Sequence, residues 1–205
     1  MLHATTHNDA LLSHFQELTA YHVWALTRIA DWLRTKPGLL LENRASSSFP
    51  GIKATLLHMV EVEREWMGHL GVSHSLLQEG LEDELEAILD SLLEQGRLLQ
   101  DYVGKLSTDA LETECSWQLL LAGEMNLARK DILQHCINHS VYHRGQVVTI
   151  GHQLGLKDAP LTDYLFYCLK VKKPDLQTRE QERGGSRVTD DTSRRPFLAI
   201  NFFNR

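Results

Sequence analysis

The sequence has little that points to a membrane or to export. None of its apolar runs approaches the roughly 18 residues that a membrane-spanning helix needs. The first residues, MLHATTHND, lack the basic start and the apolar stretch of a secretory signal peptide. We therefore expect a cytoplasmic protein with no membrane partner.

Cysteine is also scarce, with three residues in a chain of 205, and no Cys-x-x-Cys pair occurs. The wide spacing of Cys115, Cys136 and Cys168 suggests neither a disulfide framework nor a thiolate zinc site. We expect all three to be small hydrophobic side chains in a reducing compartment.

Positive charge is in deficit, since 21 Lys and Arg face 27 Asp and Glu, for a formal net charge of −6. Binding to nucleic-acid phosphates requires clustered basic residues, so nucleic acid is not expected as a partner. The hydrophobic content of 42% and the length are sufficient for one globular domain with its own core.

Apolar residues recur with helical spacing over most of the chain and predict an all-α protein. Four long helices are expected, at about 8–33, 52–70, 81–106 and 128–153. Each has one apolar stripe, which favours a four-helix bundle.

The segments between and after these helices have other patterns. The Ser-rich stretch before Pro50-Gly51 predicts a loop, and residues 107–126 predict a short extended or hairpin insertion before the last long helix. A short closing helix is expected near 163–171. The bundle domain is predicted to span 1–173, and the polar residues 174–205 a disordered C-terminal tail.

The end signals of the helices are local. Asn8 or Asp9 is expected to cap the first helix, and Pro37-Gly38 to end it. Gly71 is expected to end the second helix and Gly155 to follow the fourth.

Histidine is abundant, with eleven residues, and three of them are spaced four apart in the fourth predicted helix. His135, His139 and His143 therefore project from one face, with Cβ atoms about 6 Å apart. Two imidazoles at this spacing can converge on one cation. His58, in the second predicted helix, lies close to an apolar stripe and needs a partner if it is buried. The spacing alone does not decide which of the three bind, or whether His58 meets them.

Four segments carry motifs beyond helical periodicity. The most specific is the block Asn138-His139-Ser140-Val141-Tyr142-His143-Arg144-Gly145-Gln146. The others are Tyr21-His22-Val23-Trp24-Ala25, then Ser48-Phe49-Pro50-Gly51-Ile52 leading to His58, Glu63 and Trp66, and finally Thr162-Asp163-Tyr164. Together these segments resemble the DinB-like (DNA-damage-inducible, YfiT-related) family of metal-dependent enzymes. His22 departs from the family, which usually has Asn at this place.

The resemblance implies a four-helix bundle, often dimeric, with a metal held by His58, His139 and His143. His135 would then be a supporting or structural residue. The resemblance also suggests chemistry with a low-molecular-weight thiol as co-substrate. Imidazole ligands suit Zn or Ni first, with Fe and Cu as further candidates.

Glu61 and Glu65 follow His58 by three and seven residues, close to its helical face. Either is a candidate general base or a partner of an imidazole, and a solvated carboxylate is the alternative. Asn138 and Gln146 are candidates for orienting the ligands, with a structural role as the alternative. Arg144 is a candidate for holding an anionic thiol or substrate, but a salt bridge within the bundle is favoured. Trp66 and Tyr142 are candidate walls of the pocket, with a place in the core as the alternative.

Three functions remain open on these grounds. The first is a metal-dependent transferase or hydrolase acting on a small molecule, including a thiol-dependent S-transferase. The second is a non-catalytic metal-binding or stress-response protein, and the third an interaction bundle without metal. A homodimer is the expected assembly under the family resemblance.

Overall fold

The computed structural model describes residues 2–72, 84–119 and 123–173. Backbone contacts divide the chain into two units, Met1–Tyr167 and Cys168–Arg205. Most of the described residues are helical, and the predicted tail from 174 onward lies outside them. The predicted domain boundary at 173 stays a prediction.

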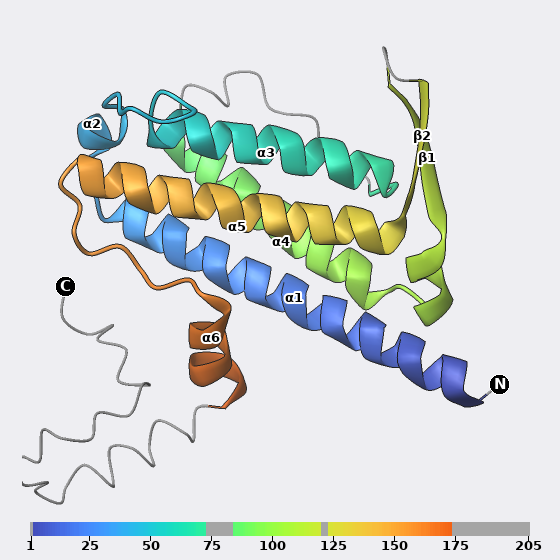
Figure 1. The fold of residues 1–205 in the computed structure, drawn as a ribbon. Coiled ribbons are helices and arrows are strands. Elements are labelled where there is room, and N and C mark those ends of the chain that lie inside the picture. Colours follow the sequence, from blue (N-terminus) through green and yellow to red (C-terminus); the bar gives the residue numbers. More distant parts are fainter. Residues whose placement is uncertain (1, 73–83, 120–122, 174–205) are drawn as a thin grey trace, which may run out of the picture. The chain divides into compact units, whose positions relative to one another are not determined.

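The first unit is a helical bundle with a small hairpin. Its long helices are α1 (Leu2–Arg34), α3 (Ile52–His69), α4 (Leu85–Gly104) and α5 (Arg129–Gln153). α1 and α3 each pack on both α4 and α5, so the four helices close into a ring (Figure 1). The predicted all-α four-helix bundle is confirmed.

Shorter elements join the long helices. They are α2 (Gly38–Leu41), the 3-10 helix η2 (Thr108–Glu112), the strands β1 (Glu114–Leu119) and β2 (Gly123–Ala128), and α6 (Tyr164–Tyr167). In the second unit, Cys168–Lys172 forms a short π-helical segment. The predicted hairpin before the last long helix is confirmed, because β1 and β2 pair antiparallel with Trp117 opposite Met125.

Two local predictions were wrong. The first helix begins at Leu2, well before Asn8, so neither Asn8 nor Asp9 caps it. The loop predicted before Pro50 is wrong only at its first residues, which belong to the four-residue helix α2 with its buried Leu41, while residues 42–51 form no helix or strand.

The predicted helix ends at Gly71 and Gly155 are confirmed. Both glycines have positive φ, 76° and 88°. In each case the next residue donates its N–H back to the last turn of the helix, from Val72 to Met67 and from Leu156 to Gly151. Only glycine adopts this left-handed conformation without strain, so α3 and α5 end at these positions.

The apolar core lies in two main clusters along the bundle axis. One surrounds Ile29, Leu56 and Ile150, and the other surrounds Phe15, Met67 and Ile132, next to the hairpin. No helix among the described residues is long and apolar enough to cross a membrane.

Candidate metal centre

α3 and α5 lie side by side (Figure 1), and the three predicted ligands belong to these two helices. His58 is on α3, and His139 and His143 are one turn apart on α5. Each of these three histidines offers a ligand atom, and the three atoms all lie within 4.8 Å of one another. The tertiary fold therefore brings together two chain segments about 80 residues apart in sequence.

The geometry within this three-histidine cluster is compact. The Nε2 atoms of His139 and His143 are 3.0 Å apart. The His58 ring centroid lies 5.2 Å from that of His139 and 4.7 Å from that of His143. Two nitrogens bound to one tetrahedral cation at ~2.0–2.1 Å are about 3.3 Å apart. The His139–His143 pair therefore already has nearly the spacing that one divalent cation requires, and the His58 ligand atom lies within 4.8 Å of both.

Gln146 orients the His143 ring. The Nδ1 atom of His143 donates to the Gln146 side-chain oxygen at 2.7 Å. The Gln146 amide nitrogen donates in turn to Tyr142 and to Ser48, which identifies its oxygen as the acceptor. In the neutral ring the proton is then on Nδ1, so Nε2 is unprotonated and directs its lone pair into the cluster, toward His139 Nε2.

The cluster favours neutral imidazoles. Burial is the main cause that lowers the pKa of His139 to about 4, and the neighbouring rings of His143 and His58 lower it further. Burial likewise lowers the pKa of His143, although its bond to Gln146 acts in the opposite direction. Neutral imidazoles are the form that binds a cation.

Aromatic side chains flank the cluster. Phe49, from the segment between α2 and α3, stacks on His58 with ring centroids 4.3 Å apart. It also meets the edge of His143 at 5.7 Å. Tyr142 lies 4.9 Å from His143 but is largely exposed. Phe49 therefore covers the cluster on the side that faces the start of α3.

A buried polar network lies behind the cluster, inside the bundle. His22 on α1 is 0% exposed and its Nε2 lies 2.9 Å from the carboxylate of Glu63 on α3, which is 4% exposed. Arg144 on α5 is 2% exposed and donates to Ser140 and to Tyr21. Burial lowers the pKa of Arg144, while Tyr21 and the Glu63 carboxylate act to raise it.

This network was not predicted from the sequence. His22 and Glu63 were noted only as parts of family-like segments, although a histidine and a carboxylate in the apolar stripes of two helices are a signal for such a pair. For Arg144, an interaction within the bundle was favoured over contact with an anionic substrate, and its guanidinium faces the bundle interior, where it donates to Ser140 and Tyr21.

The structure places the other predicted site residues outside the cluster of rings. Glu61 and Glu65 are both exposed on α3. Glu65 is two helical turns from His58, about 10 Å along the axis, and Glu61 is one turn away but rotated toward solvent. Their catalytic role stays a prediction. Asn138 is exposed and accepts a hydrogen bond from Gln134.

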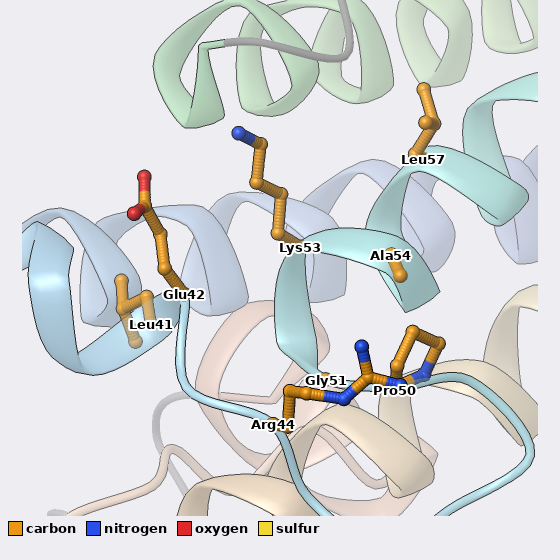
Figure 2. A pocket seen from close by; sticks show the side chains of 8 residues that line it. All are labelled: Leu41, Glu42, Arg44, Pro50, Gly51, Lys53, Ala54 and Leu57. Carbon is orange, nitrogen blue, oxygen red and sulfur yellow. The ribbon is translucent and has the colours of Figure 1, made fainter.

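A separate cavity of about 380 Å³ lies near the start of α3 (Figure 2). Its walls come from α2, the following segment and the first turns of α3, and include Leu41, Arg44, Lys53 and Leu57. The three histidines of the cluster are not among the residues that line it.

The protein is therefore a candidate metalloprotein, because two neighbouring helices of its bundle hold three converging imidazoles. The chain belongs to the DinB family, whose model matches residues 3–180. It is 28% identical over 166 residues to the protein DinB of Bacillus subtilis (strain 168), covering 76% of this chain and 94% of that protein.

Proposed function

We propose that the protein binds one divalent transition metal through His58, His139 and His143. The observation that supports this most strongly is the approach of the three ligand atoms to within 4.8 Å of one another. The lone pair that Gln146 directs into the cluster and the lowered pKa of His139 support the same proposal. Zn or Ni is the preferred occupant, ahead of Fe and Cu.

We propose further that the site is enzymatic and acts on a small molecule, as a thiol-dependent S-transferase or a hydrolase. Three neutral ligands leave the charge of a divalent cation unreduced and a position open, which lowers the pKa of a bound thiol or water. In the transferase reaction the sulfur bonds to an electrophilic carbon, and the leaving group departs with the bonding electrons. Glu61, Glu65 or solvent accepts the thiol proton.

The free cysteines support a cytoplasmic location, and the charge of the chain speaks against a nucleic-acid partner. Cys115, Cys136 and Cys168 are unpaired, as expected in a reducing cytoplasm. The net charge of −6 does not favour nucleic acid as a partner.

We propose a homodimer that uses the outer face of α5, where Val141 and Tyr142 are exposed hydrophobic residues. Sedimentation analysis tests this assembly, because the wild-type protein should sediment as a dimer and Val141→Asp should sediment as a monomer.

Metal analysis of protein purified without a histidine tag tests the metal centre. About one equivalent of Zn or Ni is expected, and replacement by Co²⁺ should give the visible absorption of a tetrahedral site. His143→Ala is expected to lose the metal, whereas His152→Ala, at an exposed position of the same helix, should keep it. Less than about a tenth of an equivalent after metal supplementation would rule the centre out.

A separate assay tests catalysis. Metal-loaded protein is mixed with a small thiol and an electrophile, and product formation is compared with that of His143→Ala and His152→Ala. Turnover that is lost only in His143→Ala supports the enzyme. A fully loaded protein without turnover across a panel of thiols and esters would instead indicate a non-catalytic metal-binding protein.

A further inference from the structure

The two sides of the three-histidine cluster differ in what covers them. On the side facing the start of α3, Phe49 packs against both His58 and His143. On the side facing the hairpin, the neighbouring residue is His135, which is exposed. The cluster is therefore covered by Phe49 on one side and bordered by an exposed residue, His135, on the other.

Beyond His135 a row of aromatic rings continues. The ring of His135 lies 5.8 Å from that of His139 with an interplanar angle of 28°. The ring of Trp66 lies 4.3 Å from that of His135. Trp66 then meets Trp117 edge to face at 5.7 Å.

The bundle geometry explains this row. α3 and α5 run antiparallel, so His58 meets His143 and His139, and Trp66, two turns further along α3, meets His135, one turn earlier on α5. β1 contacts α3 and adds Trp117, which stacks on His69 at 4.2 Å. The hairpin therefore adds one ring to the row, at the last turn of α3.

The two tryptophan rings of the row are only partly buried in the core. Trp66 and Trp117 pack against the core cluster around Phe15 and Met67, yet both remain partly exposed. Partly exposed tryptophans beside a polar site offer apolar ring surface that a flat group of a ligand can contact. By contrast, Trp32, at the other end of the bundle, is 6% exposed.

We propose that His135, Trp66 and Trp117 form a stacking subsite for a planar, aromatic or conjugated group of the substrate, whose polar end reaches the metal. This inference rests on the proposed metal centre. It narrows the substrate class from any small molecule to one with a flat apolar part separated from its metal-binding group.

Binding of three hydroxamates to Co²⁺-loaded protein tests the subsite, with the visible absorption of Co²⁺ as the readout. Acetohydroxamate has no ring, benzohydroxamate has one, and biphenyl-4-hydroxamate carries a second ring farther from the metal. Each stage is expected to bind about threefold to tenfold tighter than the one before it.

Variants locate the effect. Trp66→Leu and His135→Ala should each remove most of the advantage of the biphenyl compound while acetohydroxamate affinity stays within about twofold. His135→Ala is at an exposed position, so it reports on the subsite even if Trp66→Leu folds poorly. Trp24→Leu, on α1 and packed against Tyr21 and Tyr167, is the matched control.

The outcomes separate the two proposals. Protein that binds Co²⁺ and all three hydroxamates equally well would overturn the subsite and leave the metal centre intact. A ring-dependent advantage that persists in both Trp66→Leu and His135→Ala would overturn the subsite in the same way. Failure to bind Co²⁺ overturns the metal centre and the subsite together.

Discussion

Gln146 connects the three-histidine cluster to the surrounding surface through its side-chain amide. Its oxygen accepts from His143 Nδ1, and its nitrogen donates to Tyr142 and Ser48. Such supporting bonds hold a ligand in one tautomer and one orientation, so they contribute to metal affinity without touching the metal.

Replacing Gln146 by Leu is therefore expected to weaken metal binding by about 10–100-fold. The leucine side chain cannot accept the Nδ1 proton, so the ring is free to turn or to change tautomer. Gln146→Glu keeps an acceptor at the same place and should bind within a few fold of the wild type. Competition with a chromogenic chelator measures the affinities, and equal values for Gln146→Leu and the wild type would contradict this role.

Glu63 is the buried carboxylate of the network behind the cluster, in contact with His22 and within the electrostatic reach of Arg144. Removing one partner of a buried charged group leaves the others without compensation, which costs more than the net worth of the interaction. The network also connects α1 with α3 and α5, the two helices that carry the three histidines.

Glu63→Leu is accordingly expected to lower the free energy of unfolding by about 3–5 kcal/mol. Glu86→Gln, in the exposed contact with Arg34, should change it by about 1 kcal/mol or less. Urea denaturation followed by circular dichroism measures both. A Glu63→Leu protein as stable as Glu86→Gln would show that Arg144 is compensated by other groups.

At the scale of single elements, α5 carries two glycines in contrasting surroundings. A Cβ on Gly151 would lie 2.5 Å from the ring of Trp32, which is buried and bonded to Asp158. A Cβ on Gly145 would have no atom within 4 Å. Glycine is therefore required at 151 for close packing of α5 on α1. At 145 a substitution would affect only the conformational preference of the backbone.

Alanine at these two positions should change the free energy of unfolding in opposite directions. Gly145→Ala is expected to raise the free energy of unfolding by up to about 1 kcal/mol, because alanine favours the helix. Gly151→Ala gains the same helix propensity, but its methyl group displaces the Trp32 ring, so the free energy of unfolding should fall by about 1–3 kcal/mol. Denaturation midpoints of the two variants test this, and stabilisation by Gly151→Ala would mean that Trp32 moves freely.

The elements themselves were predictable because their signals are local. Apolar spacing indicated the four long helices, and the alternation around Trp117 indicated a hairpin. The errors arose where local signals do not decide. α2 depends on the burial of Leu41 against distant residues, and α1 continues N-terminal to the residues that were expected to cap it.

At the scale of the whole molecule, the metal and the fold are thermodynamically linked. The cation binds only when α3 and α5 are docked, since one ligand comes from α3 and two from α5. Anything that binds the folded state alone stabilises it by mass action.

Saturating metal is therefore expected to stabilise the protein by roughly 4 kcal/mol at a thousandfold excess over Kd. That corresponds to a rise in Tm of about 8–16 °C for a chain of this size. His58→Ala should abolish most of the rise, because it leaves only the two ligands of one helix. Calorimetry with and without metal measures the difference, and an equal rise in His58→Ala would place the cation elsewhere.

The sequence by itself determined the four amphipathic helices, the glycine ends of α3 and α5, and the presentation of His139 and His143 on one helical face. These follow from backbone geometry over a few residues. Only the tertiary structure decided that His58 joins them, that Arg144 and His22 turn inward, and that Trp66 and Trp117 meet beside His135. Such contacts depend on the register between helices, which the packing of many side chains sets collectively.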